Sequence, residues 1–347
     1  MLKKLSPGLK ALAALIVLVL AVTGMRLTAL DREPPRIEIM ALSRTVKNGG
    51  CAAVVIHLAE ENPGVIRLFD SAGGVFFPAV FRTNSYYLCL FACPAAESNY
   101  SLWVIASDTE GNCVTNKIPV VFEYVDYPKG RVELKGGFGN DKLAEMGLPE
   151  SGLTGTNLYA YVQSCFLAKT AADPLKLSLG PVPAIRGDFR FPVFLPLAKP
   201  VVTSGFGKTR EYYFKCKKMK QSTHYGVDMI GTLHDTVLFS AAGEVVFAGY
   251  NGGWGNTAIV GHGYGLYTLY AHCSEVTVTN KQAVFPGESA GYTGATGEVE
   301  GEHLHFGVMV QGVWTDGAEW MNPEWVERQI NSVLGKASAM ITARTVQ

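Results

Sequence analysis

The first hydrophobic segment of the chain lies between two positively charged flanks. Three lysines among residues 1–10 precede an uncharged stretch from Ala11 to Met25, and Arg26 closes it. This stretch is long for a signal-peptide core but shorter than the roughly 20 residues of a relaxed membrane span. The flanking Lys and Arg side chains can make up the missing length, because they can extend towards the membrane surface. We interpret residues 11–30 as a retained signal anchor or transmembrane helix, with a cleaved signal as the alternative. Residues 1–10 would form a cytoplasmic tail, because the positive flank stays inside.

Short apolar runs separated by turn signals follow from residue 33 to residue 126. Turns such as Glu61-Asn62-Pro63-Gly64 divide them at the spacing of a β-sandwich. The segment Ser101–Asn112 also resembles the penultimate strand and turn of bacterial immunoglobulin-like envelope modules. We therefore predict an immunoglobulin-like β-sandwich here. Its expected strands are Ala52–Leu58, Gly64–Phe69, Val75–Phe81, Tyr86–Phe91, Tyr100–Ala106 and Ile118–Tyr124.

A connector and a second β-rich region complete the pattern. Residues 127–190 are interrupted by prolines, and within them Asp141–Met146 and Asn157–Thr170 are predicted as short helices. Strand and tight-turn signals return after Phe189, which predicts a second, antiparallel β-domain over residues 191–335. No long amphipathic helix is expected. The predicted fold class is therefore mainly β.

Composition narrows the classes of function. Thirty basic residues balance thirty acidic ones, so the chain lacks the positive field that nucleic-acid binding requires. A hydrophobic content of 48% excludes a disordered chain. The seven cysteines are an odd number without any CxxC pair, which argues against a zinc ribbon or a thioredoxin-like redox site.

Histidines gather near the C-terminal end. Six of the seven lie at or beyond residue 224, in the clusters His224-Tyr-Gly-Val-Asp228, Tyr270-Ala-His272 and His303-Leu-His305. On a strand, residues i and i+2 share a face, so the two imidazoles of the last cluster point the same way. Three ligands drawn from imidazole and carboxylate are typical of a catalytic zinc site. His224, Asp228 and one of the paired histidines supply that set, and the residues alone do not decide which one.

The remaining two histidines then have roles in catalysis. Hydrolysis of a peptide bond needs a proton acceptor for water and a group that stabilises the developing oxyanion. Strict alternation along Leu266–His272 predicts that His272 shares a face with Tyr270 and Thr268. If that face borders the His303–His305 strand, His272 can reach the oxyanion without touching the metal.

Several motifs in one order carry a resemblance to a known family. Over Gly205–Trp325 the chain resembles the lysostaphin-type (LytM-type) zinc endopeptidases, which cut the peptide portion of bacterial cell walls. HxxxD and HxH are weak motifs separately, but in this order and spacing they are specific. The matching strings are SGFG at 204–207, HYGVD at 224–228, AAGEVVFAG at 241–249, GNTAIVGHGYGLYTLYAH at 255–272, GYTGATG at 291–297 and HLHFG at 303–307.

The resemblance implies a role for each residue of the site. One Zn²⁺ per chain would be held by His224, Asp228 and His305. His303 would be the general base, and His272 would hydrogen-bond the oxyanion. The fold implied is an antiparallel LytM-type peptidase domain, also called a duplicated hybrid motif.

The same resemblance implies a substrate and a place in the cell. The substrate would be the stem or cross-link peptides of peptidoglycan, and nucleic acid would not be a partner. The location would be the bacterial cell envelope, with the anchor in the cytoplasmic membrane and the catalytic domain on the periplasmic side. The alternatives are a non-catalytic regulator that activates a separate wall hydrolase, with an envelope regulatory protein as partner, and a wall-binding module.

Two regions depart from the family pattern. The segment between Phe206 and His224 is long for the family, and its basic run Lys215–Lys220 either attracts anionic wall polymer or forms an exposed charged hairpin. Glutamates at 298, 300 and 302 crowd the approach to the HLH strand, where a carboxylate could add a metal ligand or bias the charge of the substrate, although a solvated loop is the ordinary interpretation. Three tyrosines could line substrate subsites, namely Tyr264, Tyr267 and Tyr270. Packing is the usual role of tyrosines on strands.

Overall fold

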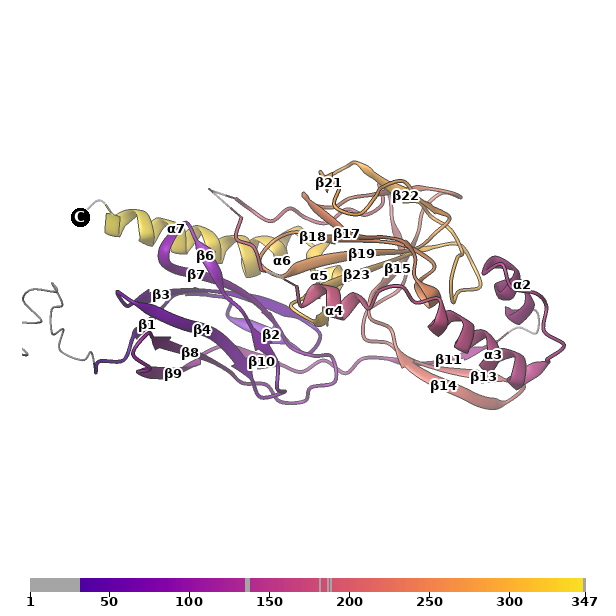
Figure 1. Ribbon diagram of the computed structural model, residues 1–347, viewed down its shortest axis with the longest axis horizontal. Coiled ribbons are helices and arrows are strands. Elements are labelled where there is room, and N and C mark those ends of the chain that lie inside the picture. The colour runs from indigo at the N-terminus through magenta and orange to yellow at the C-terminus, as the bar shows by residue number, and fades with distance from the viewer. Residues whose placement is uncertain (1–31, 135–137, 181, 186, 188, 346–347) are drawn as a thin grey trace, which may run out of the picture.

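The computed structural model describes residues 32–345, apart from 135–137, 181, 186 and 188 (Figure 1). The expected cytoplasmic tail, 1–10, and signal anchor, 11–30, lie outside the described residues. Among the helices of the described ranges, none combines the length and the apolar character needed to cross a membrane. The described chain is mainly β, and almost all of its strand pairs are antiparallel.

The N-terminal β-rich region has two four-stranded antiparallel sheets, in the orders β1–β3–β7–β6 and β5–β4–β8–β9, and a short parallel pair of β2 with β10. Two runs that were expected as single strands are each divided at a proline, Pro78 and Pro119, which cannot donate to a strand ladder. The strands are β1 Arg36–Leu42, β2 Thr45–Lys47, β3 Cys51–Ala59, β4 Pro63–Asp70, β5 Val75–Phe76, β6 Ala79–Phe81, β7 Thr83–Ala92, β8 Leu102–Asp108, β9 Cys113–Ile118 and β10 Val121–Glu123.

The C-terminal β-rich region is built on an antiparallel sheet with the order β12–β15–β23–β19–β18–β17–β21, in which β24 also pairs with β23. A smaller sheet, β16–β22–β20, accompanies it. Strand β23 is central and entirely buried. The strands are β12 Val201–Ser204, β15 Val227–Ile230, β16 Thr236–Leu238, β17 Gly243–Tyr250, β18 Asn256–Gly261, β19 Leu266–Cys273, β20 Glu275–Val276, β21 Ala283–Val284, β22 Ser289–Tyr292, β23 Leu304–Val310 and β24 Val313–Thr315.

The connector is partly helical. Helices α2 (Phe138–Glu145) and α3 (Gly155–Ala168) confirm the two predicted helices, each beginning two or three residues earlier than expected. A third helix, α4 (Pro174–Ser178), and a strand, β11 (Lys129–Glu133), were not predicted. Strand β11 pairs in parallel with β13 (Thr209–Phe214), which forms a hairpin with β14 (Lys217–Thr223). The long segment before His224 is therefore an ordered hairpin that is tied to the connector.

The two β-rich regions share one hydrophobic core. Its buried members include Val54 and Phe91 of the first region and Phe194, Phe306 and Trp320 of the second. Polar contacts cross the same boundary, because the Gln311 side chain accepts from the backbone N–H of Phe77 at 2.7 Å and donates to the carbonyl of Leu90 at 3.0 Å. The sandwich is thus packed directly against the second region.

A long C-terminal helical stretch corrects the prediction that no long amphipathic helix is present. It runs through α6 (Pro323–Trp325), a π-helical segment (Val326–Asn331) and α7 (Ser332–Thr345). Helix α7 lies across β1 and β3 of the sandwich (Figure 1), with Val333, Leu334, Ala337 and Ile341 buried. The expected boundary at residue 335 falls inside this helix.

Candidate metal centre

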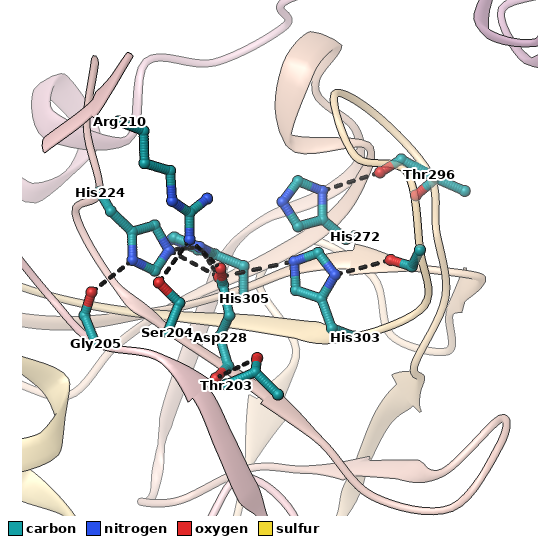
Figure 2. Close-up of polar contacts among 11 residues, drawn as sticks. Thr203, Ser204, Gly205, Arg210, His224, Asp228, His272, Thr296, His303 and His305 are labelled. Carbon is teal, nitrogen blue, oxygen red and sulfur yellow. Dashed lines mark hydrogen bonds and ion pairs between the residues drawn. The ribbon is translucent and has the colours of Figure 1, made fainter. Parts of the chain in front are cut away.

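Two adjacent strands bring three of the predicted residues together. In the register between β15 and β23, Asp228 lies directly opposite His305, and paired residues have side chains on the same face. His224 lies just before β15 and faces them (Figure 2). Gly226 leaves room for this arrangement, because a Cβ at that position would collide with the His305 ring.

The polar atoms of these three residues converge. His224 donates Nδ1–H to the Gly205 carbonyl at 2.8 Å, which leaves a lone pair on its Nε2. That Nε2 lies 2.8 Å from Asp228 Oδ1 and 3.1 Å from His305 Nδ1. His305 Nδ1 is 2.9 Å from the same carboxylate oxygen. Two acceptors that face each other at hydrogen-bond distance are unfavourable unless a proton or a cation lies between them.

This donor set fits a metal ion. One ligand atom from each of His224, Asp228 and His305 lies within 4.8 Å of the other two, and all three side chains are buried. Two imidazole nitrogens and one carboxylate oxygen are ordinary zinc ligands. Among the described residues, His305 Nε2 has no hydrogen-bond partner.

The electrostatics of the cluster keep Asp228 and His305 unprotonated. Burial opposes the charge on Asp228, but the adjacent His224 and His305 rings outweigh it and hold the pKa of this carboxyl below its usual range. Burial lowers the pKa of His305 to about 4, although the Asp228 carboxylate acts in the opposite direction. At neutral pH the cluster therefore offers a carboxylate and a neutral His305 imidazole to a cation.

The other two predicted residues lie beside this cluster. The His272 ring centroid is 5.0 Å from that of His303 and 5.8 Å from that of His305. His303 donates Nδ1–H to the Gly301 carbonyl at 2.8 Å, and its Nε2 lies 3.7 Å from Asp228 Oδ1. His272 donates Nδ1–H to the Thr296 carbonyl at 2.9 Å (Figure 2). Burial, and then the neighbouring His303 and His305, hold the pKa of His272 well below its usual value. The neutral His272 ring thus carries a lone pair on Nε2, and Nε2 is also the ring nitrogen of His303 that is turned towards the cluster.

The face predicted for His272 was wrong. Tyr270 and Phe306 are paired on the core side of the sheet, whereas Ala271 is paired with His305 on the side of the cluster. Strict alternation would have turned His272 back towards the core. Instead His272 has φ 63°, beside an irregularity in the pairing of β18 with β19. This left-handed residue breaks the alternation and keeps the ring on the side of His305.

A cavity of about 520 Å³ opens over the cluster. The β13–β14 hairpin contributes Arg210, Tyr212 and Lys220 to one side, and the loop before β23 contributes Glu298 and Val299 to another. Lys220 and Glu298 form an ion pair across it. The complete lining is Arg210, Tyr212, Lys220, Ser222, Thr223, His224, Tyr225, Asp228, Gly253, Trp254, His272, Glu298, Val299, His303 and His305.

Sequence reasoning missed Arg210. Its guanidinium donates to Asp228 Oδ2 at 2.6 Å and to Ser204 Oγ at 2.7 Å, so it holds the carboxylate oxygen that faces away from His224 and His305. Burial opposes the charged guanidinium, but the contact with Asp228 outweighs this and raises the pKa of Arg210. No local motif marks this residue, because the pairing of β13 with β14 is what brings it to the cluster.

The tyrosines proposed for substrate subsites are buried in the core and do not line the cavity. The Tyr264 hydroxyl donates to the Val80 carbonyl at 3.0 Å, and the Tyr270 hydroxyl accepts from the Ser240 N–H at 3.0 Å. Tyr267 is also buried. Their usual packing role therefore holds, and the aromatic residues that do line the cavity are Tyr212, Tyr225 and Trp254.

Comparisons with known proteins agree with this site. The family model described as Peptidase family M23 matches residues 222–317, which include all five predicted site residues. The DD-carboxypeptidase/endopeptidase Mpg of Neisseria meningitidis is 37% identical over 89 residues, covering 26% of this chain and 20% of that protein. The peptidoglycan DD-endopeptidase ShyA of Vibrio cholerae is 35% identical over 89 residues, covering 26% of this chain and 21% of that protein.

A solved structure of a zinc-containing peptidase from Vibrio cholerae is 28% identical, with a TM-score of 0.32 over 38% of this chain and 39% of that chain. This chain spans about a fifth of the length of the two curated relatives named above. The match of the family model confirms the resemblance found in the sequence, and the chain contains a peptidase family M23 domain.

Proposed function

We propose that this protein is a zinc-dependent endopeptidase that hydrolyses peptide bonds in the stem or cross-link peptides of bacterial peptidoglycan. The observation that carries the proposal is the convergence of His224 Nε2, Asp228 Oδ1 and His305 Nδ1 under an open cavity. The M23 match and the DD-endopeptidase names of the relatives support the same activity.

The ligands in this proposal are His224, Asp228 and His305. When bound, zinc would polarise the scissile carbonyl and lower the pKa of water towards about 7. Arg210 holds the second oxygen of Asp228 and so fixes how that carboxylate is presented. The hydrogen bond from His224 to Gly205 fixes its ring in the tautomer that a metal requires.

Proton transfer falls to the two neighbouring imidazoles. His303 presents the lone pair of Nε2 near Asp228 and takes the proton of the attacking water. His272 stabilises the developing oxyanion through Nε2. Because its Nδ1–H is already donated to Thr296, this hydrogen bond uses a second ring proton, which is the proton that the attacking water releases and that the adjacent His303 passes on; it leaves with the amine when the peptide bond breaks.

A non-catalytic regulator is not favoured, since no residue that the mechanism requires is missing from the cluster. The location is part of the proposal. The segment 11–30 would hold the protein in the cytoplasmic membrane, with the peptidase domain on the periplasmic side.

The test uses the full chain and purified peptidoglycan. We expect one zinc per chain, loss of peptide release after treatment with a chelator, and recovery when zinc is added. Mass analysis of the released peptides would identify the bond that is cut. A zinc-loaded protein that releases no peptide would contradict the proposal, and two metals per chain would contradict the ligand set.

A further inference from the structure

The hydrogen-bond partner of His272 lies on a glycine-rich loop. The Thr296 carbonyl accepts the His272 Nδ1–H, and Gly294 and Gly297 lie on either side of Thr296. Gly297 has φ 79°, a conformation that favours glycine. Glycines free the backbone to take many conformations, so contacts between the loop and the rest of the fold must hold the Thr296 carbonyl in place. One such contact is the hydrogen bond that the Thr296 hydroxyl donates to the Cys273 carbonyl at 2.7 Å.

Two more contacts come from helix α2 of the connector, and they bracket Thr296. Lys142 Nζ donates to the Ala295 carbonyl at 2.7 Å. Glu145 Oε1 accepts from the Gly297 N–H at 2.6 Å. The Lys142 and Glu145 side chains also pair with each other at 2.8 Å. Peptide groups on both sides of Thr296 are therefore fixed by one pair of side chains.

This pair is itself held firmly. Lys142 is buried, only 8% exposed, and its amino group is paired with the Glu145 carboxylate and the Ala295 carbonyl. The Tyr250 hydroxyl also donates to Glu145 Oε1 at 3.1 Å. Buried residues of α2 and α3, among them Leu143 and Leu158, form a separate hydrophobic cluster that supports the helix. Helix α2 lies outside the residues that match the M23 family.

We propose that Lys142 and Glu145 are positioning residues for His272, acting through the backbone of residues 295–297. The inference rests on the proposed function, because it assigns His272 to turnover. It makes the connector part of the catalytic apparatus. Without the pair, the Thr296 carbonyl would sample several positions and the His272 ring would lose its fixed orientation.

The first measurement is peptide release by full-length variants acting on a soluble cross-linked peptidoglycan peptide. Glu145→Ala should lower kcat by about 10- to 100-fold, since small displacements of a catalytic group have effects of this size. KM and zinc content should change little. Glu145→Gln keeps an acceptor for Gly297 but removes the anionic partner of Lys142, so it should recover only part of the rate. Glu150→Ala, an exposed glutamate of the same connector, is the matched control and should behave like the unmodified protein.

The second measurement separates positioning from general destabilisation. In a His272→Ala background, Glu145→Ala should have almost no further effect on kcat, because the group that it positions is gone. An equal fold-loss in both backgrounds would overturn the proposal, as would an undiminished kcat in Glu145→Ala. If Glu145→Ala does not fold, Lys142→Met takes its place with the same expectations.

A third measurement does not depend on activity. In protein whose histidines are labelled with ¹⁵N, the His272 Nδ1–H, which is hydrogen-bonded to the Thr296 carbonyl, should give a distinct NMR signal. The signal is assigned by its absence from the spectrum of His272→Ala. Glu145→Ala should broaden or remove the signal, and Glu145→Gln should restore it in part. An unchanged signal in Glu145→Ala would reject the positioning role. If the unmodified protein releases no peptide, the proposed function fails, while this signal still tests the contact from helix α2.

Discussion

Two of the three cluster residues, Asp228 and His305, are held differently from the two neighbouring histidines. Asp228 and His305 are fixed by the ladder between β15 and β23, at the centre of the large sheet. His303 and His272 take their orientation from single hydrogen bonds to loop carbonyls, those of Gly301 and Thr296. A ladder shares its geometry among many bonds, whereas one bond to a loop can be lost alone. We therefore expect metal binding to withstand changes around the site that turnover does not.

The largest effect should come from the cluster itself. His305→Ala removes a ligand, so zinc should be lost and peptide release should fall by more than about 10³-fold, beyond the 10- to 100-fold typical of residues that only orient a ligand. Metal analysis together with the release assay measures both. Retention of one zinc per chain would contradict the assignment of this residue.

His303→Ala should separate the two kinds of residue. It removes a proton acceptor without removing a ligand, so kcat should fall by about 10²- to 10⁴-fold while zinc stays at one per chain. The assays are the same as for His305→Ala. Equal zinc loss in the two variants would reject the assignment of roles within the pair.

His272→Ala should have a somewhat smaller effect of the same kind. An oxyanion donor contributes about 10²- to 10³-fold to the rate, and the loss should fall on kcat far more than on KM. Zinc content and the thermal midpoint should stay close to those of the unmodified protein. A variant that works at nearly the original rate would make His272 a structural residue.

A substitution at Arg210 tests whether the β15–β23 ladder alone is enough to keep the zinc affinity of the cluster. Arg210→Lys keeps the charge but shortens the side chain, so it withdraws the single nitrogen that donates both to Asp228 Oδ2 and to Ser204 Oγ. Zinc affinity should weaken by about 10- to 100-fold, measured by competition with a chelator, with the cluster still able to load at high zinc. Unchanged affinity would mean that the sheet alone holds the carboxylate.

Strand positions followed from sequence more reliably than the final helix. Alternation and β-branched residues marked most strands of the first region, but β1, β2 and nearly all of β9 were not predicted, and two expected runs were divided at Pro78 and Pro119. The segment of α7 contains Gly335 and several β-branched residues, which have weak helix propensity. It is helical because it covers β1 and β3, a contact between the two ends of the described chain that no local pattern contains.

The site shows the same division. HxxxD and HxH are local spacings and could be recognised directly. Which member of the histidine pair lies opposite Asp228 depends on the register of β15 with β23, and only the family resemblance supplied that choice. The face of His272 was wrong because one left-handed residue interrupts the strand. Arg210 and the α2 pair come from elements distant in sequence, so they became visible only in the fold.

The contacts between the two β-rich regions determine how short a fragment can be and still fold around the metal centre. Lys47 on β2 pairs with Asp316 at 2.8 Å and with Glu319 at 3.2 Å, both at helix α5 (Gly317–Trp320) or its N-cap. A piece cut at residues 191 and 335 would carry the whole M23 match, yet it would leave the largely buried Glu319 side chain without this cation and would remove the sandwich half of the shared hydrophobic core. Burial already raises the pKa of Glu319 to about 7. The sandwich supplies part of the hydrophobic core on which the M23-matching region is packed, so a soluble fragment of that region has to include the sandwich.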